Sequence, residues 1–170
     1  TAIDGVTNSV IATIPVGDTP VSVDVNATTN RIYVANAHSD NVTVIDGSTH
    51  TVITTLSVGG TPNSVSVNPV TNRIYTANAS GIFGNSVSVI DGATNTVIAT
   101  IPVGNGPRDV VVNKNTNLIY VSNYADNTVS VIDGATNTAI ATLSVGNSPE
   151  GMGINLVTNR IYVTNTLSNT

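Results

Sequence analysis

Cysteine and tryptophan are absent from the 170-residue sequence, and charged residues are scarce. Without cysteine the chain can form no disulfide, no thiolate nucleophile, no cysteine-based zinc site and no covalent attachment for a c-type haem. Charged side chains make up 9% of the residues, whereas soluble domains carry about a quarter. Other polar residues must therefore cover the surface.

Positively charged side chains are fewer than negatively charged ones. Five Lys and Arg residues, spread from Arg31 to Arg160, leave a net charge of −5. Binding to a phosphate backbone needs clustered Lys and Arg, so this distribution argues against nucleic acid as a partner. No apolar run approaches the roughly 18 residues of a membrane-spanning helix, and no spanning segment is expected.

The residues that are abundant favour β-structure. Val, Ile, Thr, Asn and Ser recur along the whole chain, and β-branched side chains fit a pleated sheet better than a helix. Apolar and polar residues alternate with a period of two, and turn residues follow at short, regular intervals. This pattern predicts short antiparallel strands joined by hairpins.

A repeat then defines the architecture. The tripeptide Ile-Asp-Gly recurs at 3–5, 45–47, 90–92 and 132–134, at intervals of 42, 45 and 42 residues. Repeats of about 40–50 residues with four strands each are typical of β-propeller blades. We therefore predict an all-β fold, a β-propeller of four-stranded antiparallel blades. Four tyrosines keep the same intervals and are expected to pack blade against blade: Tyr33, Tyr75, Tyr120 and Tyr162.

The phase of the repeat predicts one propeller module over residues 1–170 with one blade split between the chain ends. The contiguous blades are expected at about 20–58, 62–103 and 107–145, and the split blade at 149–165 plus 1–16. Three arrangements stay open. They are a four-bladed ring closed within one chain, a larger ring closed by self-association of two chains, and a fragment of a longer array.

The repeat also carries a resemblance to a known family. Residues 127–138 (NTVSVIDGATNT), residues 140–146 and the tetrapeptide Tyr-Val-Thr-Asn at 162–165 resemble the YVTN family of β-propeller repeats, which are WD40-like. The resemblance implies a module similar to those of archaeal and bacterial cell-surface and surface-layer proteins. It therefore implies an extracellular, cell-surface or periplasmic location and protein partners, and it implies no cofactor.

Departures from the repeat indicate where function lies. Loops that enter the innermost strands share one face with the loops between second and third strands, beside the central channel. The two residues after each inner-strand proline differ from blade to blade: Val21-Ser22, Asn63-Ser64, Arg108-Asp109 and Glu150-Gly151. The candidates for a polar site at this channel mouth are Asp18, Arg108, Asp109 and Glu150.

A three-residue insertion lengthens one loop on the same face. The lengthened loop spans residues 79–85 and contains the only phenylalanine of the chain, Phe83, next to Ile82. Apolar residues at a loop tip are candidate partner contacts, although this tip can equally fold back onto its own blade. Tyr124 and His38 lie in the equivalent loops of other blades and extend the candidate contact surface.

Other recurring polar residues are interpreted as structural. The Asp-Gly pairs at Asp4, Asp46, Asp91 and Asp133 are expected in hairpin turns, where Asp accepts backbone N–H groups and Gly supplies a positive φ. His38 and His50 fall on opposite faces and cannot share a metal ion, so neither a metal site nor a catalytic group is expected. Three sequons are candidate glycosylation sites outside the cytoplasm: Asn26, Asn41 and Asn78.

These features favour a non-catalytic, extracytoplasmic β-propeller, acting as a structural or protein-interaction module of a cell-surface assembly. One alternative is a small-ligand-binding or enzymatic propeller that uses the channel mouth. Another is an accessory subunit of a larger extracellular or periplasmic redox complex, in which any cofactor belongs to the neighbouring subunit.

Overall fold

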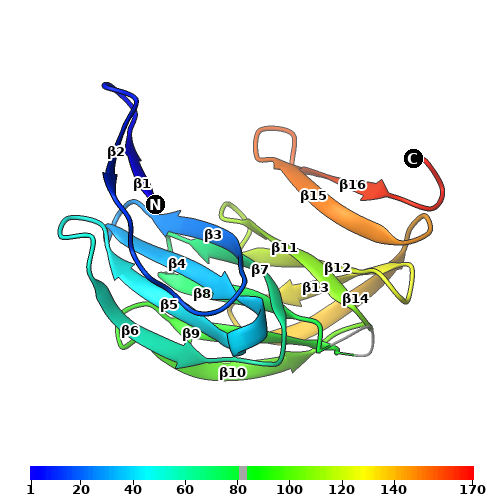
Figure 1. The fold of residues 1–170 in the computed structure, drawn as a ribbon. Coiled ribbons are helices and arrows are strands. Elements are labelled where there is room, and N and C mark those ends of the chain that lie inside the picture. Colours follow the sequence, from blue (N-terminus) through cyan, green and yellow to red (C-terminus); the bar gives the residue numbers. More distant parts are fainter. Residues whose placement is uncertain (81–83) are drawn as a thin grey trace.

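The computed structural model describes residues 1–80 and 84–170, which form a row of antiparallel β-sheets (Figure 1). Three of the sheets have four strands each, in sequence order from the inner to the outer edge. The first blade contains β3 (Pro20–Asn26), β4 (Arg31–Asn36), β5 (Asn41–Asp46) and β6 (Val52–Ser57). The second contains β7 (Pro62–Asn68), β8 (Arg73–Asn78), β9 (Ser86–Asp91) and β10 (Thr96–Pro102). The third contains β11 (Pro107–Asn113), β12 (Leu118–Asn123), β13 (Thr128–Asp133) and β14 (Thr138–Ser144).

Two further strands lie at each end of the chain. β1 (Ala2–Asp4) pairs with β2 (Ser9–Ala12), and β15 (Pro149–Asn155) pairs with β16 (Arg160–Asn165), as two separate sheets. Between β4 and β5 the chain makes one turn of 3₁₀-helix, η1 (Ala37–Ser39). The predicted all-β fold of repeated four-stranded sheets is confirmed, whereas the joining of the two end sheets into one blade stays a prediction. No helix in the described ranges is long and apolar enough to cross a membrane.

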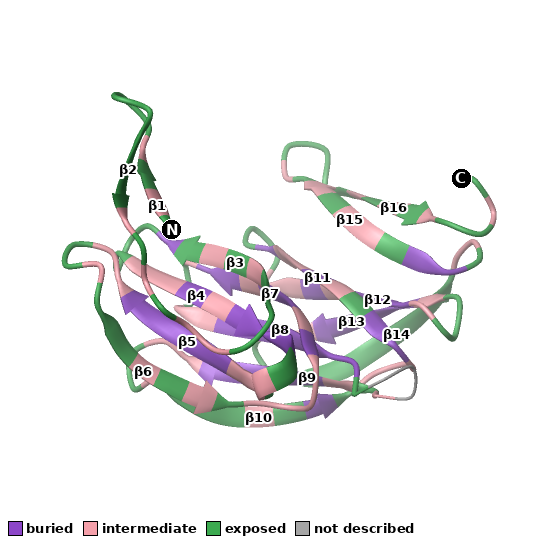
Figure 2. Ribbon diagram, in the orientation of Figure 1, coloured by how far each residue is buried: buried purple, intermediate pink, exposed green. Residues whose placement is uncertain are grey.

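The inner strands hold the row together. β3 packs beside β7, β7 beside β11, and β11 beside β15. One apolar cluster lies between the first and second blades and a second lies between the second and third, as the purple segments in the middle of Figure 2 show. Tyr33 and Tyr75 are fully buried in these clusters, which confirms their predicted role in packing blade against blade.

The last two tyrosines of the repeat have no complete following blade to cover them, since only β15 and β16 follow the third blade. Tyr120 is half-buried, and Tyr162 on β16 is 58% exposed. The environment of this repeat position is therefore set by the presence of a next blade, since the residue type is the same throughout.

The aspartates of the Asp-Gly pairs act as predicted. Asp46 Oδ1, for example, accepts the backbone N–H groups of Ser48 at 2.8 Å and Thr49 at 3.2 Å. The hydrogen bond from the Ser48 N–H, followed by those from the Arg31 guanidinium and the Thr49 N–H, holds the pKa of Asp46 below its usual value. Equivalent bonds form at the other three turns, to Asp4, Asp91 and Asp133.

The expected role of the neighbouring glycines was wrong. The positive φ in these hairpins belongs to the residue four positions after each aspartate: Asn8, His50, Asn95 and Asn137. Glycine is needed because the chain passes close to an asparagine. A Cβ added at Gly92 would lie 2.4 Å from Asn72 Oδ1 and 2.9 Å from the Tyr33 hydroxyl oxygen. Gly47 and Gly134 meet Asn30 and Asn117 in the same way.

An asparagine pair links each inner strand to the next blade. Asn26 Nδ2 donates to Asn72 Oδ1 at 2.8 Å, and Asn68 Nδ2 donates to Asn117 Oδ1 at 2.8 Å. At the third junction Asn113 Nδ2 donates to Asn159 Oδ1 at 2.6 Å. The donor always ends an inner strand, and the acceptor lies in the following hairpin in the left-handed conformation, with φ between 52° and 57°. Asparagine suits that acceptor position because it tolerates the left-handed region.

Burial of Tyr75 predicts a pH dependence of stability. Desolvation raises the pKa of the Tyr75 phenol to about 12, and no described residue bonds to its hydroxyl. The unfolded chain loses this proton near pH 10. The contribution of the protonated Tyr75 phenol to stability is therefore fully present below pH 10 and is lost as the pH rises toward 12. We expect Tyr75→Phe to reduce this fall, and to change the free energy of unfolding at pH 8 by less than about 1 kcal/mol because it removes an unpaired hydroxyl. Urea unfolding at pH 8, 10 and 11.5 measures both effects, and an unaltered pH dependence would contradict the assignment.

Candidate functional site at the inner-strand rim

The four variable residue pairs gather on one rim of the structure. They surround a hollow of about 340 Å³, lined by Val21, Ser22, Asn63, Ser64, Arg108, Asp109, Glu150 and Gly151. The cause is the repeat itself. Each pair follows the proline that begins an inner strand, and the inner strands lie side by side. The structure thus brings together Arg108, Asp109 and Glu150, but Asp18 does not line this hollow.

Asp109 is the best-connected side chain of the rim. Its Oδ1 accepts a hydrogen bond from Ser64 Oγ at 2.8 Å, and its Oδ2 accepts the backbone N–H of Met152 at 2.8 Å. It therefore joins β11 to β7 on one side and to β15 on the other. Ser64, one blade earlier, and Ser22, two blades earlier, also connect inner strands. The Ser64 hydroxyl accepts the N–H of Val110, and the Ser22 hydroxyl accepts the N–H of Val65.

Arg108 and Glu150 have no comparable role in the scaffold. Both residues are exposed. The Arg108 guanidinium lies over the ring of Tyr124, 4.9 Å from its centroid, in a cation–π contact. Among the described residues no ion pair joins Arg108 to Glu150. The guanidinium, the phenol and the carboxylate are therefore available at the surface of one rim.

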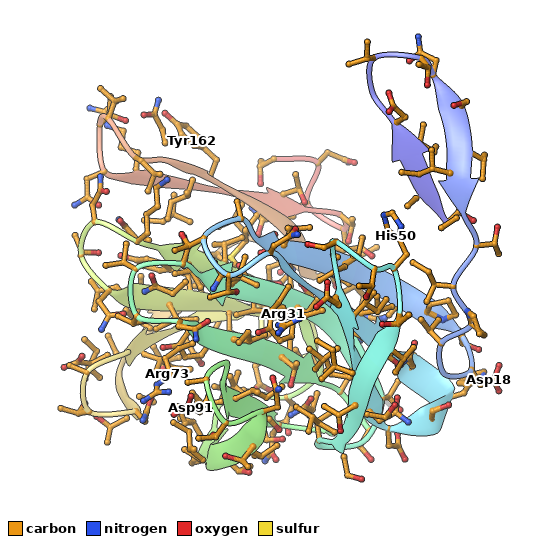
Figure 3. All side chains as sticks on the ribbon, turned by 90° about the vertical axis from the view of Figure 1, so that its left-hand side faces the viewer. Asp18, Arg31, His50, Arg73, Asp91 and Tyr162 are labelled. Atoms are coloured by element: carbon orange, nitrogen blue, oxygen red, sulfur yellow. The ribbon has the colours of Figure 1, made fainter. Side chains whose placement is uncertain are left out.

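Asp18 and His38 form a second, smaller polar cluster. His38 Nδ1 lies 2.9 Å from Thr19 Oγ1 and 3.9 Å from Asp18 Oδ2. The backbone N–H of His38 also donates to the carbonyl oxygen of Asp18. The loop entering β3 and the loop between β4 and β5 are thus neighbours, as the sequence predicted. Figure 3 shows Asp18 at the edge of the molecule, and both side chains of this cluster are largely exposed.

Two predicted contact residues, Ile82 and Phe83, lie outside the described residues. In the described part of the chain, no group of three or more His, Asp and Glu side chains could hold a metal ion. His50 lies in the turn between β5 and β6, near the hairpin of β1 and β2 (Figure 3), where it lines a different groove from the rim hollow.

The structure corrects two of the three candidate glycosylation sites. Asn26 and Asn78 are buried. Asn26 Nδ2 donates to Asn72, and Asn78 Nδ2 donates to Ser88 Oγ at 2.9 Å. A glycan on either nitrogen would break these bonds and has no space in the folded chain. Asn41 is half-buried and accepts a hydrogen bond from Asn36, so its glycosylation stays a prediction.

Sequence reasoning missed two features of the site. One is the stacking of Arg108 on Tyr124, for which the only signal was that both residues belong to the same blade. The other is an apolar groove of about 560 Å³ on the free face of the first blade, between that face and the N-terminal segment. Its lining valines belong to the repeat and gave no signal of their own, because their equivalents in other blades are buried.

Similarity to known proteins was found at the level of structure. No protein-family model matches the sequence, and no curated protein is detectably similar to it. The chain is similar in structure to a chain of hydrazine synthase from Kuenenia stuttgartiensis, with a TM-score of 0.78 and 24% sequence identity. The alignment covers 88% of this chain and 44% of the hydrazine synthase chain. The chain has a β-propeller-like repeat fold. At this identity the similarity shows the fold alone, and this chain spans less than half the length of its match.

Adjacent residues of β11 provide a test that separates scaffold from surface. We expect Asp109→Ala to lower the free energy of unfolding by about 1–3 kcal/mol, because it leaves the Met152 N–H and the Ser64 hydroxyl without their acceptor. Arg108→Ala should change it by less than about 0.5 kcal/mol, since the side chain is exposed. Asp109→Ser should recover part of the loss, because serine fills this position in the first two blades. Urea unfolding of the three variants measures the differences, and equal effects at 108 and 109 would refute the distinction.

Proposed function

We propose that this chain is a non-catalytic β-propeller module that presents its inner-strand rim to a protein partner. The observation that carries the proposal is the difference in role between the adjacent residues Arg108 and Asp109 on that rim. In the third blade Asp109 bonds to both neighbouring inner strands, whereas Arg108 beside it projects without such a role.

The residue types at the exposed rim positions support a protein-binding role for this surface. Arg and Tyr, together with Trp, are enriched among the side chains that dominate binding energy in protein interfaces. Here an arginine is held in place by an aromatic ring before any partner arrives, which reduces the conformational entropy lost on binding. The glutamate one blade away adds a charge of opposite sign on the same rim.

Membership of the YVTN family and a location outside the cytoplasm are part of this proposal. They are supported by the repeated sequence motifs and by a propeller-like fold that needs no disulfide. A role as a structural module in a cell-surface or surface-layer assembly follows from the same resemblance.

A second candidate function is small-ligand binding in the rim hollow. Its volume of about 340 Å³ lies at the lower end of ordinary ligand sites. A guanidinium, a carboxylate and the Asn63 amide all line it. The hollow is shallow and polar, which fits a peptide or protein side chain better than an enclosed ligand.

The proposal predicts that the rim can be inactivated without unfolding the chain. We expect Arg108→Ala and Tyr124→Ala each to weaken partner binding at least tenfold, because each removes one half of the stacked pair. Lys114→Ala is the matched control, since Lys114 is exposed in the hairpin at the other end of β11.

Affinity capture from envelope and soluble fractions of the native source, with quantitative mass spectrometry, measures the effect. The proposal requires a partner that the wild type and Lys114→Ala retain and that both rim variants lose. Equal capture by all four proteins would overturn it. Loss of binding only to a small metabolite, measured by calorimetry, would favour the second candidate.

A further inference from the structure

Two departures from the repeat meet in the third blade. In each repeat the residue after the second strand donates its backbone N–H to the loop that enters the inner strand, and these residues are Ala37, Ala79, Tyr124 and Thr166. Alanine makes this bond as well as tyrosine does, so the scaffold gives no reason for an aromatic ring. The Tyr124 ring instead lies against the guanidinium of Arg108, the one cationic residue at the four equivalent rim positions. The two unusual residues therefore occur together and in contact.

The Arg108 guanidinium has no carboxylate partner among the described residues. The ring contact orients the side chain but supplies no oxygen acceptor for its five N–H donors. The adjacent carboxylate of Asp109 is already occupied, because Ser64, Val110 and Met152 donate to its two oxygens. The three ion pairs of the described ranges involve other residues. The guanidinium is therefore available to a carboxylate from outside the chain, which its planar fork of donors can bind in a bidentate manner.

Glu150 is held near Arg108 by the scaffold without pairing with it. The Ser122 hydroxyl accepts the backbone N–H of Asp109 at 3.0 Å and donates to the carbonyl oxygen of Glu150 at 2.7 Å. Ser122 is fully buried, so one hydroxyl fixes the backbone of β11 and β15 next to the two charged side chains. Both side chains are exposed, and both line the hollow of about 340 Å³. A positive and a negative group are thus fixed on neighbouring strands and face solvent.

These contacts lie inside the row of inner strands. β11 packs beside β7 on one side and beside β15 on the other, and the bonds of Asp109 and Ser122 join all three blades concerned. The positions of Arg108 and Glu150 relative to each other are therefore set by junctions that the chain itself contains.

We propose that the partner of this rim is a protein segment that presents an acidic side chain to Arg108 and a basic side chain to Glu150. The inference rests on the proposed function, because it assigns the chemistry of the partner at the same rim. A segment with an acidic side chain alone would leave Glu150 unpaired. A phosphorylated segment would bring up to two negative charges toward Asp109 and Glu150. Opposite charges on one segment give both exposed rim residues a partner.

Synthetic peptides are a defined probe of this charge pairing. The probes are short Gly-Ser peptides, acetylated and amidated at their ends, with one Asp and one Lys at varied separation. Two derivatives neutralise one charge at a time, by replacing the Asp with Asn or the Lys with Gln. Titration of ¹⁵N-labelled protein, followed through the amide NMR shifts of rim residues, measures the dissociation constants up to the millimolar range.

We expect each peptide charge to be coupled to one rim residue. Replacing the peptide Asp with Asn should weaken binding to the wild type at least fivefold and should have no effect on binding to Arg108→Gln. Replacing the Lys with Gln should weaken binding to the wild type similarly and should have no effect on binding to Glu150→Gln. Each variant also controls for the other, because Arg108→Gln should still distinguish Lys from Gln. Such a cycle isolates a direct pairing from a general loss of affinity.

Lys114→Gln is the control for net charge. It removes the same charge as Arg108→Gln, from an exposed residue in the hairpin at the other end of β11, and should bind every peptide as the wild type does. Circular dichroism should show all variants folded, because the three substituted side chains are exposed. Phosphoserine in place of the peptide Asp should bind less tightly than Asp, since Asp109 and Glu150 repel its second charge.

Three results would overturn the charge pairing. They are an equal contribution of the peptide Asp in the wild type and in Arg108→Gln, a coupling found for only one of the two charges, and an absence of rim shifts with every peptide at millimolar concentration. Tighter binding of phosphoserine would also overturn it, because the rim would then select phosphate. A partner that the wild type captures and that Arg108→Ala and Tyr124→Ala lose would, beside any of these results, uphold the proposed function while refuting this partner chemistry.

Discussion

The packing of one blade against the next is the constraint on which the whole structure depends. Each sheet is apolar on the faces that meet its neighbours, so a blade in isolation would expose residues that are fully buried here, such as Tyr33 and Ile90. Antiparallel sheets with one solvated face alternate apolar and polar residues strictly. These blades are covered on both faces, which is why Val, Ile and Tyr occupy them so densely. The free energy of folding is therefore shared between repeats, and an end without a neighbour remains incomplete.

The same constraint accounts for the low charge of the sequence. Close packing of blades leaves buried polar atoms that require partners, and short neutral side chains supply them. Asn26 and Asn68 bond to the next hairpin, and Ser22 and Ser64 bond to the next inner strand. A buried lysine or glutamate in these places would lose hydration with no opposite charge in return. In the described part of the chain, the two ion pairs between a carboxylate and an arginine lie where the hairpins are partly exposed, at Arg31 and Arg73.

The sequence predicted the blades well because their signals are periodic. Alternation, turn residues and the Ile-Asp-Gly repeat placed the three complete sheets to within one or two residues of the observed strands. What it could not predict depends on contacts between repeats. Gly47 and Gly92 looked like turn residues with a positive φ, whereas a neighbouring asparagine is what excludes a side chain. Asn26 and Asn78 matched an exposed sequon, although junction contacts bury them. The stacking of Arg108 on Tyr124 joins a strand to a loop sixteen residues away, and no local pattern encodes that contact.

Position within the repeat also explains why sequence variation collects at the rim. In a strand, adjacent side chains point to opposite sides, so Asp109 can bond to β7 and β15 while Arg108 faces outward beside it. Substitution of Arg108 leaves the junction bonds of Asp109 intact. The residue types on the two end faces of the row do not vary in this way. Val23 and Tyr162 have the residue types of junction positions, but within the described ranges they are 62% and 58% exposed because no further blade covers them.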